Sequence, residues 1–306
     1  MNNKRVEYIA HEPVMANEVL ELLENIDDGT FIDATYGDGS HFELIRAKFP
    51  KLNLFGIDRD NDSVLSANKN NTVFKYNFSD LDSFVQEKRL KEIKCIFFDF
   101  GMSTHQIMNE DRGFSFQNNA DLDMRMDQKD SLSAKDFINS ASIEEIILIL
   151  REYGEENHAY KIGNMIVESR PYRKTSELSE SIARAVPVKN PIAKKKSVRR
   201  CFQAIRIHIN NELTHIHHGL HKSIDIIDSG GMIITISYHS LEDRIVKKIF
   251  KESSVDCICP TEIPECVCNQ QPKILLGRPS KIKPSKAEIT RNRKSKSAIL
   301  RYAVKL

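Results

Sequence analysis

A glycine turn and an acid at the end of a strand are the residues whose spacing first points to chemistry. The turn spans residues 35–41 (TYGDGSH), follows a short apolar stretch and precedes an amphipathic one. Backbone amides in a turn that opens a helix can bind a polar or anionic ligand group, and Gly37 and Gly39 permit close approach. Asp58 lies 21 residues beyond Gly37, where a carboxylate can accept hydrogen bonds from both hydroxyls of a ribose. The pair predicts a site for an adenosyl cofactor.

The same turn leaves two alternatives open. A dinucleotide fingerprint requires a third glycine, and position 42 is Phe42, so G-x-G-x-x-G is incomplete. This disfavours a nicotinamide oxidoreductase, which is the second enzyme class. Glycine turns and strand-end aspartates also occur without any ligand.

A parallel sheet must bring such residues together. Three apolar stretches predict strands, and a weaker one lies near 72–76; the strong ones are 30–34, 52–57 and 95–100. Each ends at or beside an acid, namely Asp33, Asp58 and Asp99. Because ligands bind at the carboxyl ends of parallel strands, we expect a doubly wound α/β domain with its site at this edge.

The strand pattern stops after about residue 105 and helical periodicity replaces it. A capping box formed by Ser142 and Glu145 predicts the start of one helix. Apolar residues from Phe202 to Ile227 then recur at steps of three and four and predict one long helix, after which residues 232–237 (MIITIS) resume the sheet. We therefore predict a discontinuous domain, 1–105 and 201–306, interrupted by a helical insertion at 106–200.

Charge is unevenly distributed along the chain. Residues 269–306 hold eleven Lys or Arg and one acid, whereas the other 268 residues hold 34 cations and 42 acids. A second stretch, 181–211, holds eight cations and no acid, and we predict that a basic loop leads out of the insertion at 189–200. Such stretches favour a polyanion partner over a merely solvated surface, so we expect the loop and the cationic tail to contact nucleic acid.

Seven motifs in fixed order make the sequence resemble one family. They are DATYGDGSH, GIDRD, FFDFGMSTHQI, RGFSF, DLDMRMD, FQAIRI and SYHSLEDRIVK. The set resembles the bacterial small-subunit rRNA cytosine-N4 methyltransferase family from about residue 11 to 306. The resemblance implies a Rossmann-like S-adenosylmethionine-dependent methyltransferase sheet with an inserted helical domain. It implies methylation of N4 of one cytidine in the decoding region of 16S rRNA, with the insertion recognising the RNA.

The resemblance also implies a set of cofactor residues. With Gly37 of the turn, these positions are Gly39, Ser40, His41, Asp58, Phe78, Asp99 and Gln106. Asp58 would bind the ribose, Phe78 would lie on the adenine, and Asp99 with Gln106 would border the methionine end. The alternative interpretations are that Phe78 is a core residue and that Gln106 caps a turn. Family members often have glycine at Ser40 and proline at His105, and this chain differs at both.

Transfer to an exocyclic amine needs positioning and a hydrogen-bond acceptor more than a strong base. Asp99 is the first candidate catalytic residue. The other candidate cytidine contacts are Asp123 and Arg125 of DLDMRMD, and Ser237 and His239 of SYHS. His239 could equally be structural at a strand end. A C5 methyltransferase is disfavoured because no Pro-Cys pair supplies its nucleophile.

Two clusters resemble metal sites, and we predict no metal ligand among the site residues. Four histidines between His215 and His221 fall on a helix without further ligands at metal-site spacing and are interpreted as a polar face. The four cysteines of C-x-C-x6-C-x-C are Cys257, Cys259, Cys266 and Cys268. Zinc sites usually use C-x2-C pairs, so this spacing favours the interpretation that the cysteines bind no metal. A structural metal site is the alternative.

Composition sets the remaining expectations. With 306 residues, 40% of them hydrophobic, the chain can form about two domains and is neither disordered nor fibrous. Its start is polar and no apolar run could span a bilayer, so we expect a cytoplasmic protein with reduced cysteines and no membrane partner. The family resemblance implies 16S rRNA or the small ribosomal subunit as partner. A non-enzymatic ribosome-assembly factor is the alternative that Asp58 and Asp99 argue against. The sequence leaves the oligomeric state open, a homodimer included.

Overall fold

The computed structural model describes residues 12–257, 259, 265, 267–268 and 270–306. The chain divides into two compact units. Unit 1 contains Met1–Gly101 and Ile216–Leu306, and unit 2 contains Met102–His215. Each unit has its own apolar core, and each is described by itself.

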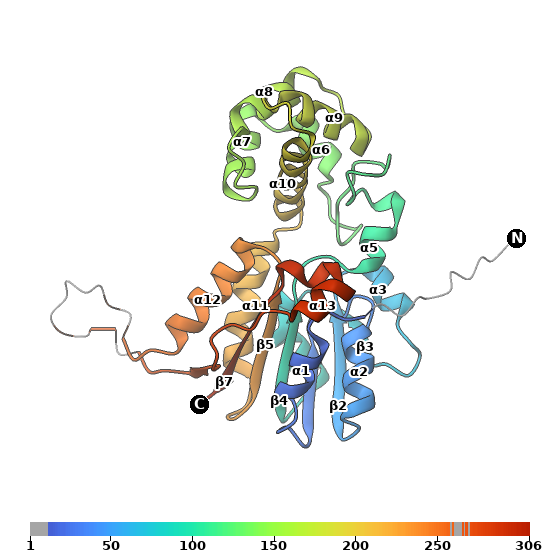
Figure 1. Ribbon diagram of the computed structural model, residues 1–306. Coiled ribbons are helices and arrows are strands. Elements are labelled where there is room, and N and C mark those ends of the chain that lie inside the picture. The colour runs from blue at the N-terminus through green and yellow to red at the C-terminus, as the bar shows by residue number, and fades with distance from the viewer. Residues whose placement is uncertain (1–11, 258, 260–264, 266, 269) are drawn as a thin grey trace, which may run out of the picture. The chain divides into compact units, whose positions relative to one another are not determined.

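Unit 1 is built on one seven-stranded sheet with the strand order β3-β2-β1-β4-β5-β7-β6 (Figure 1). The strands are β1 (Gly29–Asp33), β2 (Leu52–Asp58), β3 (Val73–Lys75), β4 (Ile93–Asp99), β5 (Met232–Ser237), β6 (Ile274–Leu276) and β7 (Ile299–Lys305). Strands β1 to β5 are mutually parallel, and β7 lies antiparallel between β5 and β6. The predicted α/β fold is therefore confirmed, and the strand order reverses at β1 and β4, where such sheets bind ligands.

Helices flank this sheet (Figure 1). They are α1 (Ala16–Leu22), α2 (Ser40–Lys48), α3 (Asn61–Ser66), α4 (Leu81–Lys88), α11 (Glu212–Ile226), α12 (Ser240–Ser253) and α13 (Lys286–Arg291), with short turns η1 (Phe78–Asp80) and η3 (Arg293–Ser297). Strand β1 is buried along its whole length, as expected for a central strand covered on both faces. Phe31, Phe97 and Ile234 from three adjacent strands share one core cluster.

Unit 2 is helical. Its elements are α5 (Thr104–Met108), η2 (Glu110–Arg112), α6 (Ala134–Ser140), α7 (Ile143–Glu152), α8 (Ala159–Glu168), α9 (Thr175–Ala185) and α10 (Pro191–Ile209). The predicted capping box is present at α7, where the Ser142 hydroxyl accepts a hydrogen bond from Glu145 N at 3.2 Å. Ile146, Ile162 and Ile205 from three of these helices belong to one buried cluster.

The prediction of one long helix from Phe202 to Ile227 is wrong, because the apolar stripe continues across a break. Helix α10 ends at Ile209 and α11 begins at Glu212. Asn211 has a left-handed backbone, with φ of 49°, which an asparagine tolerates better than most residues. Asn210 is buried at the end of α10, and its side chain donates to the Arg206 carbonyl at 2.9 Å. The spacing of apolar residues does not reveal this break, because the three-and-four spacing continues from α10 into α11.

The prediction of a basic loop at 189–200 is also wrong, because most of this segment forms the first half of helix α10. The Asn190 side chain caps this helix by accepting from Ile192 N at 2.9 Å, and Pro191 occupies the first helical position. Val198 and Cys201 on its inner side are buried in unit 2. The second boundary of the insertion consequently lies after His215, not after residue 200.

The cationic tail is folded into unit 1. It contains β6, α13 and β7, and its lone acid, Glu288, is buried and accepts a hydrogen bond from Met15 N at 2.7 Å. Exposed cations remain along it; they are Lys273, Arg278, Lys281, Lys283, Lys286, Arg291, Arg293, Lys294 and Lys296. Within the described residues, no helix is both long and apolar enough to cross a membrane.

Candidate cofactor and catalytic site

The glycine turn lies between β1 and α2 and is tied to the end of β2. Gly37 and Gly39 have positive φ angles, 53° and 75°. A Cβ at position 39 would also overlap the Tyr36 hydroxyl, so this turn requires glycine for both conformation and space. Gly37 N donates to Asp58 Oδ2 at 2.7 Å, and Asp60 N donates to Asp58 Oδ1 at 2.8 Å. The acid and the turn that were predicted to act together therefore lie in contact.

Asp58 retains the capacity to bind a diol. Each carboxylate oxygen has two lone-pair sites, and each uses one for the backbone amides of Gly37 and Asp60. Burial raises the pKa of Asp58 to about 6, and the two amide bonds oppose that rise. The carboxylate is thus held in a fixed orientation with an acceptor site left on each oxygen.

Asp99 ends β4 and is held on two sides. Its backbone N donates to Thr35 Oγ1 at 2.6 Å, and the Tyr238 hydroxyl donates to Asp99 Oδ1 at 2.7 Å. A quarter of its side chain is exposed. Burial raises the pKa of Asp99 to about 7; the Tyr238 hydrogen bond lowers it, and the charge of Glu242 raises it further. A carboxyl with this pKa can gain or release a proton near neutral pH.

His41 faces the same carboxyl from α2. Its Nε2 lies 2.9 Å from the Val14 carbonyl oxygen, which can only accept, so Nε2 carries a proton. Burial lowers the pKa of His41 to about 4, and the ring is neutral at pH 7. Its unprotonated Nδ1 lies 3.6 Å from Asp99 Oδ2. The histidine consequently adds no positive charge that would depress the pKa of Asp99.

A third carboxyl lies at this edge of the sheet. Asp33 at the end of β1 is 1% exposed, and burial raises its pKa to about 8, with further contributions from the charges of Asp99 and Asp58. The charges of Asp99 and Asp58 both raise the pKa of Asp33, and a cationic ligand is favoured beside such a group of carboxyls.

Together with the diol acceptor on Asp58 and the glycine turn, this edge of the sheet fits a sulfonium nucleoside. The residues present therefore suit S-adenosylmethionine.

Ser40 and Phe78 complete the predicted cofactor set in unit 1. Ser40 is the first residue of α2, directly after the Gly39 cap. Phe78 is half-buried, with its ring centroid 5.6 Å from Phe98 in an edge-on contact and 6.0 Å from Phe100. It packs against a core without being fully enclosed, so both its structural role and the proposed adenine contact are compatible with its position.

The SYHS motif divides into residues with different roles. Ser237 is 1% exposed at the end of β5. His239 caps α12: its Nδ1 accepts from Glu242 N at 3.4 Å, and Glu242 accepts from the backbone of His239 in return. The structural role that was the alternative for His239 is therefore present. The residue between them, Tyr238, contacts Asp99 and was not predicted, although it lies inside a recognised motif.

The remaining predicted residues lie in unit 2. Gln106 forms a capping box at α5, with Oε1 accepting from Ser103 N at 3.1 Å, so the predicted alternative role as a cap is also present. Asp123 and Arg125 are paired through two bonds, Nε to Oδ1 at 2.9 Å and Nη2 to Oδ2 at 2.7 Å. About a fifth of each side chain is exposed, 22% and 23%.

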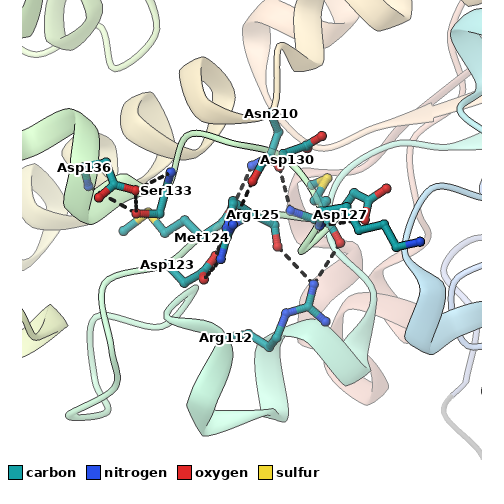
Figure 2. Close-up of polar contacts among 11 residues, drawn as sticks. Arg112, Asp123, Met124, Arg125, Asp127, Asp130, Ser133, Asp136 and Asn210 are labelled. Atoms are coloured by element: carbon teal, nitrogen blue, oxygen red, sulfur yellow. Dashed lines mark hydrogen bonds and ion pairs between the residues drawn. The ribbon is translucent and has the colours of Figure 1, made fainter.

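Two buried side chains hold the loop that carries this pair, and neither was predicted. Figure 2 shows Arg112 and Asn210 reaching the loop from different sides. Arg112, 1% exposed, donates to the carbonyls of Arg125 and Met126 at 3.0 and 2.8 Å. Asn210 accepts from Met126 N at 2.7 Å and donates to the Met124 carbonyl at 2.8 Å. The RGFSF motif contains Arg112, whereas no local pattern marks Asn210.

The cations of α10 are not equivalent. Arg200 is ion-paired at 2.5 Å with Glu156, whose side chain is fully buried, so it stabilises unit 2 itself. Lys195, Lys196 and Arg199 are exposed. A pocket of unit 2 is lined by Lys194, Lys195 and the aromatic ring of Phe116 among others.

Comparison with known proteins identifies a family. The chain matches the family model described as the MraW methylase family over residues 8–306. It is 42% identical to the ribosomal RNA small subunit methyltransferase H of Caldicellulosiruptor bescii, across 97% of this chain and 99% of that protein. It is 39% identical to the protein of that name from Carboxydothermus hydrogenoformans (97% and 98% covered) and 38% identical to that from Halothermothrix orenii (96% and 98%). A methylase family agrees with the predicted methyl donor, S-adenosylmethionine, and the predicted methyltransferase class is confirmed: this chain belongs to the MraW methylase family.

Proposed function

We propose that this protein methylates N4 of a cytidine in the decoding region of 16S rRNA, using S-adenosylmethionine, in the bacterial cytoplasm. The names of its relatives support a small-subunit rRNA substrate. The position of Asp99 is the observation that carries the proposed chemistry. It offers a carboxyl of pKa about 7 at the switch point of the sheet, oriented by Tyr238 and Thr35.

Gly37, Gly39, Ser40 and Asp58 would hold the cofactor, with the ribose on the two remaining acceptor sites of Asp58. S-adenosylmethionine supplies an electrophilic methyl group on a cationic sulfur. Because N4 would gain a bond to carbon on receiving this methyl group, it must lose one proton.

Asp99 in its ionised form accepts that proton and forms O–H. Its elevated pKa makes this acceptance more favourable than for an ordinary aspartate. The Tyr238 hydroxyl, which donates to Oδ1, and Thr35, which holds the backbone of Asp99, keep the carboxyl in one orientation, which is the positioning that transfer to a weak nucleophile requires.

Unit 2 would recognise the RNA. Its exposed Lys195, Lys196 and Arg199 suit phosphates, and the partly exposed Asp123–Arg125 pair offers both an acceptor and donors to a base. We propose these residues as substrate contacts and Gln106 as a cofactor contact.

Mapping methylated nucleosides in 16S rRNA from cells with and without the protein tests the function. We expect one cytidine of the decoding region to lose its N4 methyl group in the deletion strain and to regain it on complementation. A missing methyl on C5, on a ribose hydroxyl or in the large subunit would overturn the proposed substrate. Purified small subunits and naked 16S rRNA, compared as methyl acceptors, identify which form is used.

The Asp99→Asn variant tests the mechanism in the same assay. It preserves shape and can still accept the Tyr238 hydrogen bond, but it cannot take up a proton. We expect single-turnover transfer to fall by roughly 10²–10⁴-fold, with the affinity for S-adenosylhomocysteine nearly unchanged. Equal losses of rate and affinity would restrict Asp99 to cofactor binding.

A further inference from the structure

Three cysteines of unit 1 converge in the connection between α12 and β6. The sulfur atoms of Cys257, Cys259 and Cys268 all lie within 4.8 Å of one another. Cys266, the fourth cysteine of the sequence pattern, lies outside the described residues. The spacing of the cysteines alone favoured a segment that binds no metal. The convergence of the three sulfur atoms favours a metal site instead.

The described part of this connection is joined at its ends and has no helix or strand. Its ends are joined, because Lys273 N donates to the Ser253 carbonyl at 2.8 Å and Gln270 Nε2 donates to the Val255 carbonyl at 3.0 Å. In its described part, between α12 and β6, there is no helix or strand, and Val267 is 70% exposed. Segments without a core of their own are typically held by disulfides or metals.

The sulfur geometry suits a metal better than a disulfide. Zinc–thiolate bonds of about 2.3 Å in a tetrahedron place sulfur atoms roughly 3.8 Å apart, and the three sulfur atoms of this cluster lie within 4.8 Å of one another. A disulfide joins two sulfurs at about 2.05 Å and leaves the third beside them without a role. Thiolates select soft or borderline ions such as zinc over magnesium or calcium.

We propose that Cys257, Cys259 and Cys268 bind a structural zinc ion as thiolates, and that the ion fixes the connection between α12 and β6. The inference does not depend on the substrate of the enzyme, since it rests on the three sulfurs and on the joined ends of the segment. Metal binding would contribute free energy of folding to this segment.

Elemental analysis of the full-length protein tests the proposal. The protein is purified under reducing conditions, without chelator, from cells supplied with zinc. We expect about one zinc per chain, and less than roughly a tenth of that in a triple variant with Cys257, Cys259 and Cys268 replaced by Ser. Cys201→Ala, at a buried cysteine of α10 in unit 2, is the matched control and should retain its zinc.

Two further measurements identify the ligands. Reconstitution of the metal-free protein with Co²⁺ should produce thiolate-to-cobalt charge transfer and the intense visible absorption of a tetrahedral site, and Cys259→Ser alone should weaken the former. Amide hydrogen exchange between Ser254 and Lys273 should become at least roughly tenfold faster in the triple variant, with exchange in β1 and β4 unchanged.

Several outcomes would overturn the proposal. They are zinc in the wild type no higher than in the triple variant, iron in its place, or a disulfide among these cysteines when thiols are alkylated at lysis. If the triple variant does not fold, the zinc content of the wild type and the cobalt spectrum of Cys259→Ser still decide the matter. S-adenosylhomocysteine binding, measured in parallel, separates failure of this site from failure of the proposed enzyme.

Discussion

The Tyr238 hydroxyl donates to Asp99 Oδ1 at 2.7 Å, across the carboxyl ends of the adjacent strands β4 and β5. This bond joins two recognised motifs that are 139 residues apart in the chain. Burial raises the pKa of Asp99, and the tyrosine opposes that rise, so the bond keeps the carboxyl ionisable near neutral pH.

Replacing Tyr238 with Phe should therefore move the pH dependence of methyl transfer. Without the donor, the pKa of Asp99 rises further, and the ionised form is reached only at higher pH. A hydrogen bond to a charged group is worth about 1.5–3 kcal/mol, so the acid limb of the rate profile should shift upward by roughly 1–2 pH units. Single-turnover rates between pH 5.5 and 9 measure the shift.

Tyr302→Phe is the matched control, because the Tyr302 hydroxyl, in β7, accepts from Arg278 N at 3.0 Å and donates to the Arg278 carbonyl at 2.9 Å. A profile for Tyr238→Phe that superimposes on the wild type would show that Asp99 does not set the acid limb.

Asp58→Ala should weaken cofactor binding. Two ribose hydroxyls would lose a charged acceptor, a loss of roughly 1.5–3 kcal/mol, which is about a 10- to 150-fold rise in Kd. Calorimetry with S-adenosylhomocysteine measures it. Asp58→Asn can still accept from Gly37 or Asp60 through its remaining oxygen, so it separates loss of charge from release of the glycine turn. An unaltered Kd in a folded Asp58→Ala protein would remove the residue from the site.

Replacing Lys195, Lys196 and Arg199 of α10 with Gln should weaken RNA binding and reduce its salt dependence. Each lost phosphate contact lowers the slope of log K against log salt by about 0.7–0.9, so we expect a decrease of roughly 2–3. Arg200 is left intact because it pairs with the buried Glu156.

The charge-matched control for α10 replaces Lys51, Lys69 and Lys91 with Gln. These exposed residues precede β2, β3 and β4, so they lie toward the amino ends of the strands, opposite the carboxyl ends that form the proposed site. Equal slopes for the α10 variant and the wild type would show that α10 is a solvated surface only.

The free energy of unfolding of Asp33→Asn, relative to that of the wild type, should increase as pH rises. The folded-state pKa of Asp33 is about 8, above its value of about 3.9 in an unfolded chain, so the folded state holds the proton more tightly. The stability that this protonation contributes is complete below about pH 4 and is lost as pH rises toward 8, by at most roughly 1.4 kcal/mol per pH unit. An asparagine keeps the oxygen that accepts from Thr35 N.

Denaturant unfolding of Asp33→Asn and wild type at pH 5 and pH 8 measures the effect. The difference in unfolding free energy between the two proteins should grow with pH, and a constant difference would mean that Asp33 is ionised in the folded state.

Local sequence patterns were sufficient where structure depends on near neighbours. Strands β1, β2, β4 and β5 were predicted within a few residues, because buried parallel strands are short, continuous apolar stretches between turns. The glycine turn and Asp58 were predicted for the same reason: a tight turn at a strand end requires particular residues at particular positions. The capping box at Ser142 likewise involves residues only three apart.

Other features were missed because their signal is weak or ambiguous. Strands β6 and β7 lie in a segment that was interpreted from its cations as a tail contacting nucleic acid, and no strand was predicted there, yet Leu300 and Ala303 of β7 are completely buried. The basic half of α10 contains few apolar residues, so its composition resembled that of a loop. The Asn190–Pro191 start is nevertheless typical of a helix.

By itself, the sequence determined the fold class, the chemical types at the strand ends and the ordered motifs that identify the family. Only the tertiary structure decided which side chains meet: Tyr238 with Asp99, Arg200 with Glu156, and Asn210 with the loop of Arg125. It also decided that Cys257, Cys259 and Cys268 converge. The physical reason is that helices and strands follow from periods of 3.6 and 2 along the chain, whereas contacts between distant residues depend on strand order, register and the path of each connection.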